Sequence, residues 1–189
     1  MQIETGKSIQ TTELIAREDQ LGVLKVSAVS WGEFRAKEAK VVEPGYQPEE
    51  HHRVRKGDVL LSRANTVELV GAVVRADRNY PNRLLSDKTL RLVLDETSCC
   101  PDYIVYALRL PEARTHIEAN ATGTSDSMRN ISQDTVRAIP VALPDLPKQQ
   151  QISVRLRDLE REMTKLNSSI QRQNEELEVV PQKLLARVF

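Results

Sequence analysis

The C-terminal part of the chain carries a regular apolar pattern. After Ile152, apolar residues recur at alternating spacings of three and four. The positions are Leu156, Leu159, Met163, Leu166, Ile170, Leu177, Val180 and Leu184, and Gln173 fills the one polar slot. This 3.5-residue period predicts a narrow seam that pairs with another helix in a coiled coil. A helix packed on its own domain is the alternative, but such helices usually bury a wider stripe over a shorter length.

The limits of this helix follow from its prolines. Pro144 and Pro147 precede it, and Pro147–Val179 would form a rod of about 50 Å at 1.5 Å per residue. Pro181 cannot continue the hydrogen-bond ladder, so it predicts a kink or the start of a second helix. We therefore divide the chain into a globular domain, residues 1–146, and a coiled-coil helix, residues 147–189, with a kink at Pro181.

The first hundred residues read mainly as strands. Alternating or continuous apolar stretches bounded by turn residues predict strands over 22–30, 59–63, 69–75 and 89–94. Lys56-Gly57-Asp58 predicts a tight turn before the second of these strands.

The next fifty residues change to a helical pattern. Pro101 and Pro111 suit first turns, which predicts helices over 101–110 and 112–121. Residues 122–130 predict a polar loop, Ser132 predicts the cap of a short helix over 133–138, and 139–143 predict a last strand. The fold class is therefore α/β of the α+β type, a mixed sheet domain followed by a long helix.

Composition and charge narrow the function classes. Hydrophobic residues make up 40% and aromatic residues 4%, which gives an aliphatic core. No apolar run is long enough to span a membrane, and the adjacent Cys99 and Cys100 favour reduced thiols in a cytoplasmic protein. The net charge is zero, yet residues 51–91 hold 9 Lys/Arg against 4 Asp/Glu. Such a segment suits a phosphate-binding face, although random clustering explains it slightly better on charge alone.

The sequence offers no catalytic motif. It contains no Walker-type phosphate loop, nucleophile elbow or zinc-protease helix. His51 and His52 beside Glu49 suggest a metal, but adjacent strand residues point to opposite faces, so we expect a solvated polar loop and no metal site. We expect no catalytic residues in this chain.

Two segments carry side chains suited to nucleic acid. Arg63 can form a bidentate contact with guanine and Asn65 with adenine, and hydroxyls and cations can bind phosphates. Each residue alone is equally compatible with an ordinary surface loop. The predicted DNA-binding residues are Ser62, Arg63, Asn65, Thr66, Lys88, Thr124, Ser127, Arg129 and Asn130.

The order of these pieces resembles the DNA-specificity subunit of type I restriction–modification systems. The resemblance covers almost the whole chain and rests on G-K-S-I (6–9), K-G-D-V-L-L-S-R (56–63), P-D-Y-I-V-Y-A-L (101–108), A-T-G-T-S (121–125) and I-P-V-A-L-P-D-L-P-K-Q-Q-Q-I (139–152). Full-length members carry two target recognition domains and two helices, whereas this chain has one of each. It is a natural half-subunit, a trimmed fragment, or one half of a larger protein.

The resemblance implies a non-catalytic subunit that binds double-stranded DNA in the cytoplasm of a bacterium or archaeon. It implies docking to a modification subunit that binds S-adenosylmethionine and methylates adenine, and through the complex to a restriction subunit. No cofactor is expected on this chain itself. The helix, through Leu156, Leu159, Met163, Leu166, Ile170 and Leu177, would pair two half-subunits as a homodimer. The alternative is a coiled-coil adaptor whose globular head binds protein.

Overall fold

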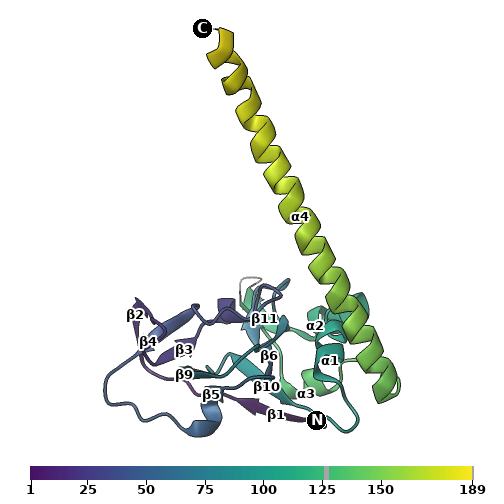
Figure 1. The fold of residues 1–189 in the computed structure, drawn as a ribbon. Coiled ribbons are helices and arrows are strands. Elements are labelled where there is room, and N and C mark those ends of the chain that lie inside the picture. Colours follow the sequence, from purple (N-terminus) through teal and green to yellow (C-terminus); the bar gives the residue numbers. More distant parts are fainter. Residues whose placement is uncertain (126–127, 189) are drawn as a thin grey trace. The chain divides into compact units, whose positions relative to one another are not determined.

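The computed structural model describes residues 1–125 and 128–188, without the side chains of Thr124 and 176–188. It forms two compact units, Met1–Gln149 and Gln150–Phe189. The elements of the first unit are drawn in Figure 1. In chain order they are β1 (Gln2–Thr5), β2 (Thr11–Ile15), β3 (Gly22–Leu24), η1 (Val26–Ala28), β4 (Ala39–Val42), η2 (Glu50–His52), β5 (Arg53–Val54), β6 (Val59–Ser62), β7 (Ala64–Asn65), β8 (Val73–Arg75), β9 (Tyr80–Leu84), β10 (Thr89–Val93), α1 (Pro101–Ala107), α2 (Pro111–Asn120), β11 (Thr122–Ser125), β12 (Met128–Asn130), α3 (Gln133–Arg137) and the start of α4 (Leu146–Val188).

The strands form three sheets. An antiparallel sheet has the order β1-β10-β6-β8, a mixed sheet has the order β2-β4-β3-β9-β5, and a small antiparallel sheet has the order β11-β12-β7. The pair β3 and β9 is parallel, and the other pairs are antiparallel. The predicted mixed α+β fold is confirmed.

Strand β6 is buried on both faces. Because side chains alternate across a strand, Val59 and Leu61 pack into one cluster with β10, α1 and α2, and Leu60 packs into a second cluster with Val74 and Leu85. All three side chains are at most 2% exposed. The continuous apolar run Val59-Leu60-Leu61 is typical of a strand covered on both sides.

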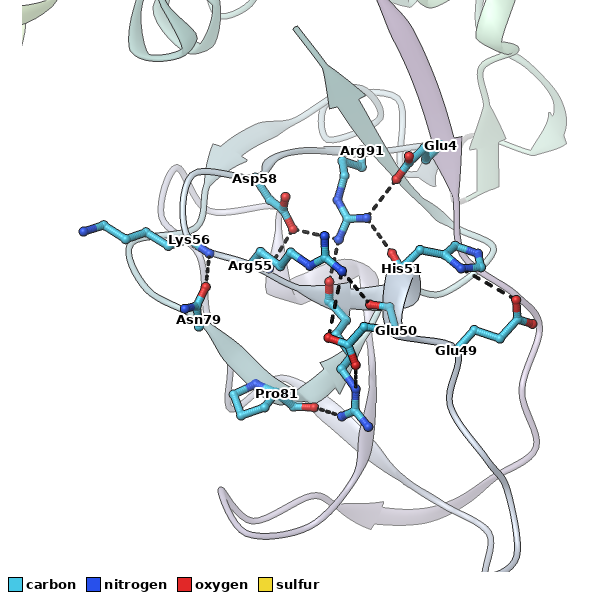
Figure 2. A network of polar contacts seen from close by, with 11 residues as sticks. Glu4, Glu49, Glu50, His51, Arg55, Lys56, Asp58, Asn79, Pro81 and Arg91 are labelled. Carbon is cyan, nitrogen blue, oxygen red and sulfur yellow. Dashed lines mark hydrogen bonds and ion pairs between the residues drawn. The ribbon is translucent and has the colours of Figure 1, made fainter. Parts of the chain in front are cut away.

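On β10, the same alternation places a charge in the interior. Leu90 and Leu92 enter the first cluster, whereas Arg91 points to the opposite face and is 6% exposed. Its guanidinium donates from Nη1 to Glu4 Oε2 (2.9 Å) and from Nη2 to Asp58 Oδ2 (2.8 Å). Further bonds run to the carbonyls of His51 and Arg53, both 2.6 Å long. Figure 2 shows this guanidinium between the two carboxylates. One side chain thus joins β10 to β1, η2, β5 and the turn before β6.

Several predicted elements are confirmed. Strand β10 matches the alternating stretch, and α2 begins at Pro111. The turn at Lys56–Asp58 is closed by Asp58 N donating to Arg55 O at 3.1 Å. Ser132 caps α3, since its hydroxyl accepts from Thr135 N at 2.9 Å.

Other expectations were wrong, each for a local reason. The strand predicted over 22–30 ends at Leu24 and becomes the 3-10 helix η1, which lets the adjacent Ala28 and Val29 both be fully buried. The strand predicted over 69–75 begins only at Val73, because Leu69 and Val70 close a turn on Thr66 O. In the described residues, 139–143 form no strand, since Pro140 lacks the N–H that a ladder needs. Within the range predicted as a loop, 122–130, the described residues Thr122–Ser125 and Met128–Asn130 instead form the antiparallel pair β11–β12.

The long helix begins with a side-chain cap. Asp145 Oδ1 accepts from Lys148 N at 3.0 Å, at the position where N-caps act. The fully buried Gln149 donates to the carbonyls of Ser98 (3.0 Å) and Pro144 (2.7 Å) and accepts from Cys100 N (2.8 Å). Gln149 therefore fixes the first turn of α4 to the start of α1.

The second unit is the remainder of α4, a helix that is continuous through Pro181 to Val188. A second helix starting after Pro181 is therefore not present, and a kink within one helix stays a prediction. The side chains of Leu159, Met163, Leu166 and Ile170 are between 46% and 63% exposed, and that of Leu156 is half-buried. Leu177 lies outside the residues whose side chains are described.

The Arg91 network generates the first prediction. Arg91→Met should lower the free energy of unfolding by about 3–5 kcal/mol, because it leaves the Asp58 carboxylate buried without its partner. Urea unfolding would measure this loss as a lower midpoint at an unchanged slope. Adding Asp58→Asn should restore part of it, since the uncompensated charge is then gone.

The matched control is Lys56→Met, on the exposed turn beside this network. It should change the free energy of unfolding by no more than about 0.5 kcal/mol. Equal midpoints for Arg91→Met and Lys56→Met would show that the buried guanidinium does not stabilise the domain.

Candidate nucleic-acid interface

Arg63 occupies the junction between two strands. It separates the end of β6 from β7, and its backbone contacts two other segments. Arg63 N donates to Lys88 O at 2.9 Å, and Arg63 O accepts from Ile131 N at 3.0 Å. The Arg63 side chain is exposed, as is that of Lys88. Within the described residues, neither side chain has a hydrogen bond or ion pair, so both charges are available to an incoming group.

The short strand β7 brings the second predicted segment to the same place. In its ladder with β12, Asn65 lies opposite Arg129 and Ala64 lies opposite Asn130. Arg129 is half-buried and donates from Nη1 to Gly123 O at 3.3 Å, whereas Asn130 is exposed. Two segments more than sixty residues apart are thus joined by backbone hydrogen bonds.

Glycine is required in the β11–β12 pair. A Cβ on Gly123 would lie 2.3 Å from Met128 O, which is closer than atoms can approach. The A-T-G-T-S motif therefore allows the two strands to pack together. The predicted contacts Thr124 and Ser127 fall outside the residues whose side chains are described, and they stay predictions.

Two predicted contact residues are engaged within the protein. Ser62 is fully buried, and its hydroxyl donates to Ala64 O at 3.3 Å. Asn65 donates from Nδ2 to Ser30 Oγ at 2.8 Å, and its Oδ1 accepts from Thr66 N at 2.9 Å. Ser62 is therefore absent from the exposed surface. Asn65 also donates to Ser62 Oγ at 3.4 Å, so its side chain would have to break three bonds to pair with a base. Thr66 is half-buried beside them.

Most of the positive charge of residues 51–91 is used inside the domain. Arg91 is buried in its ion pairs, and Arg75 pairs with Asp102 at 2.6 Å. Arg83 is 3% exposed and donates only to carbonyls, among them Ala36 O at 2.6 Å and Gln20 O at 2.9 Å. Burial lowers the pKa of Arg83. The segment is therefore not one continuous phosphate-binding face, and Arg63 and Lys88 are the cations at the junction.

The histidine pair differs from expectation. His51 and His52 lie in the 3-10 helix η2 rather than in a strand, and their ring centroids are 4.0 Å apart. The predicted opposite orientation is therefore wrong, since donor atoms of Glu49, His51 and His52 lie within 4.8 Å of one another. However, Lys7 forms an ion pair with the Glu49 carboxylate. The pKa of His52 is lowered, mainly because the ring is buried. A protein cation thus already balances the one carboxylate of this cluster.

Sequence reasoning missed the loop that follows η1. Ser30 accepts a hydrogen bond from the Asn65 amide, so the start of this loop is joined to β7. The available signal was Trp31, the one tryptophan in a chain that is poor in aromatic residues. Separately, none of the helices in the described ranges is long and apolar enough to cross a membrane.

The chain is similar in sequence to two curated proteins. It is 30% identical over 154 residues to the type I restriction enzyme EcoEI specificity subunit of Escherichia coli. These residues cover 82% of this chain and 26% of that protein. It is 24% identical over 169 residues to the EcoKI specificity subunit of Escherichia coli strain K12, 88% of this chain and 36% of that protein. The chain thus spans between a quarter and two fifths of these relatives. No family model matches it.

Solved structures share its fold. The type I restriction–modification S subunit from M. genitalium superposes with a TM-score of 0.59 at 18% identity, over 88% of this chain and 38% of that one. A chain from a study of complex assembly and conformational transition of the type I R-M system superposes with a TM-score of 0.62 at 17% sequence identity, over 94% of this chain and 40% of that one. At these identities the likeness concerns the fold alone. The curated match at 30% identity over 82% of the chain shows that this chain belongs to the family of type I restriction–modification specificity subunits, of which it spans part.

Proposed function

We propose that this chain is a non-catalytic, sequence-specific DNA-binding unit of a type I restriction–modification system. The observation that carries the proposal is the similarity to specificity subunits over 82% of the chain. It is supported by the exposed, unpaired cations Arg63 and Lys88, which backbone hydrogen bonds hold next to β7 and β12.

The chemistry of these side chains suits double-stranded DNA. The Arg63 guanidinium can donate two parallel hydrogen bonds to guanine O6 and N7 in the major groove. Lys88 supplies a point charge for a phosphate, and the exposed amide of Asn130 can contact a base edge or the backbone. Because the backbone of Arg63 is hydrogen-bonded through both its N–H and its carbonyl, only the side chain has to be ordered on binding, which limits the ordering cost.

The long helix suits pairing with a second copy. Four apolar side chains at alternating spacings of four and three, Leu159, Met163, Leu166 and Ile170, are exposed on α4. We propose that α4 pairs antiparallel with the α4 of a second chain, with Gln173 as a polar position that sets the register. A rod of about 50 Å would separate two recognition domains by more than one helical repeat of DNA, about 34 Å. The dimer would then read an inverted repeat interrupted by a spacer.

Catalysis is assigned to partner subunits. A modification subunit would bind S-adenosylmethionine and methylate adenine, and a restriction subunit would join through the same complex. This chain would bind no cofactor and would select the site at which its partners act. The proposed location is the cytoplasm, where these partners and the chromosome are found.

Selection from random duplexes tests the proposal. The purified chain should enrich duplexes that share a bipartite motif, and its affinity should fall steeply as salt rises, because phosphate contacts release counterions. A coiled-coil adaptor with a protein-binding head would enrich no motif. Binding that is insensitive to salt would contradict a DNA-binding role.

The second prediction concerns individual residues. Arg63→Ala should weaken binding to the selected duplex by about 1–3 kcal/mol and relax specificity at one base position. Lys88→Ala and Arg129→Ala should weaken binding to all sequences alike, as the loss of a phosphate contact does. Fluorescence anisotropy of labelled duplexes measures both effects.

The control is Arg17→Ala, an exposed arginine paired with Asp19 and remote from β7 in sequence and sheet order. It should bind like the unmodified chain. If Arg63, Lys88 and Arg129 variants also bound like the unmodified chain, the assignment of the interface would be wrong.

The third prediction concerns the seam. Replacing both Leu159 and Leu166 with Asp should convert a dimer into a monomer, since the pair would bury unpaired charges. Light scattering at tens of micromolar would measure the mass. Lys165→Asp, on the same helix but off the seam, should remain dimeric. A monomeric unmodified chain at that concentration would contradict self-pairing.

A further inference from the structure

We propose that Trp31 is a DNA-contacting residue whose indole ring packs on the duplex beside Arg63. This inference rests on the proposed DNA-binding function and adds a contact of a different chemistry to it. Three observations carry it, namely the exposure of the ring, the fixation of its loop and its position relative to β7.

The indole is exposed although the residues that directly precede it in the chain are buried. Trp31 is 54% exposed, whereas Val29 is fully buried and Ser30 is 7% exposed. Tryptophan is the largest apolar side chain, and leaving it in water forgoes a substantial burial energy. A single exposed apolar residue needs no explanation by itself. The explanation comes from the loop that presents it.

Hydrogen bonds fix the loop on both sides of the ring. Ser30 Oγ donates to Val26 O at 2.6 Å, and Arg109 Nη2 donates to Gly32 O at 2.6 Å. Gly32 has a φ of +78°, a backbone conformation that favours glycine and turns the chain directly after Trp31. The backbone on either side of Trp31 is thus anchored, so the ring projects from a preorganised support rather than from a loose loop.

The position of the loop connects Trp31 to the candidate interface. Ser30, its immediate neighbour, accepts the Asn65 amide at 2.8 Å. Asn65 lies opposite Arg129 in the β7–β12 ladder and two residues after Arg63. The guanidinium of Arg35 lies 5.8 Å from the centroid of the Trp31 ring, within cation–π range. An exposed aromatic ring therefore has one cation beside it, Arg35, which also pairs with Glu33 at 3.0 Å, and the residue before the ring is bonded to the strand that follows Arg63.

This combination favours DNA over a protein partner. On a duplex, an aromatic ring can pack on deoxyribose or on a thymine methyl group in the major groove, while a neighbouring arginine binds a phosphate. A protein partner would more readily use a contiguous apolar patch. The residues shown beside Trp31 are instead polar or charged: Ser30 precedes it in the chain, and Arg35 lies over its ring.

Trp31 fluorescence provides the test, because the chain contains no other tryptophan. The full chain is titrated with the duplex obtained by selection, while anisotropy of a label on the duplex reports binding independently. We expect the duplex to change Trp31 emission and to protect the ring from acrylamide quenching. Trp31→Ala should weaken binding about tenfold, or about 1.4 kcal/mol, and Trp31→Phe should retain most of the affinity.

The salt dependence separates this contact from a charged one. Trp31→Ala should leave the slope of log affinity against log salt unchanged, whereas a variant that loses a phosphate contact should reduce it by about one. Leu14→Ala, which removes another exposed apolar side chain on β2, is the control and should bind like the unmodified chain.

Two outcomes would overturn the inference in distinguishable ways. If anisotropy showed binding while Trp31 emission and acrylamide access stayed unchanged, Trp31 would not contact DNA and the proposed function would stand. If the unmodified chain selected no duplex at all, the proposed function would fall and this inference with it. The emission measurement uses the unmodified chain, so a folding defect in a variant cannot decide it.

Discussion

A buried guanidinium organises the globular domain. Arg91 lies on the face of β10 opposite the main core and satisfies its charge with Asp58, Glu4 and two carbonyls. A buried charge is tolerated only when it is paired and hydrogen-bonded, so these four segments must close around it together. Strand β6, which β10 pairs along its whole length, is thereby covered on both faces. The end of this strand presents Arg63.

The fold therefore determines the candidate interface through its backbone. Arg63 is held by bonds to Lys88 O and from Ile131 N, and β7 joins β12 immediately beyond it. Side chains at this junction can change without loss of the bonds that position them, because those bonds involve main-chain atoms. Such an arrangement suits a domain that must read different sequences on one scaffold. The Trp31 loop extends the same principle, since main-chain and side-chain bonds fix its ends and leave the ring exposed.

Sequence reasoning succeeded where the determinants are local. Alternation predicted β10, and Ser132 predicted the start of α3. The choice of Arg63, Lys88 and Arg129 as DNA contacts stays a prediction, although backbone hydrogen bonds join the segments that carry them. It failed where long-range burial decides. Ser62 and Arg83 look like surface residues in sequence. In the fold, Ser62 is buried in a strand that is covered on both faces, and the Arg83 guanidinium is buried among backbone carbonyls. The β11–β12 pair depends on contacts with β7, which no local pattern reveals.

The central claim is that residues 1–146 choose the DNA sequence at which a separate methyltransferase acts. The most direct measurement uses a hybrid in which these residues are replaced with those of a relative that recognises a different DNA sequence, while the helix is kept. Methylated adenines are then mapped in cells that contain the intact system. The account predicts that methylation moves to the relative's half-site while the spacing set by the helix is retained. A hybrid that assembles with the methyltransferase but still methylates the original sequence would contradict it.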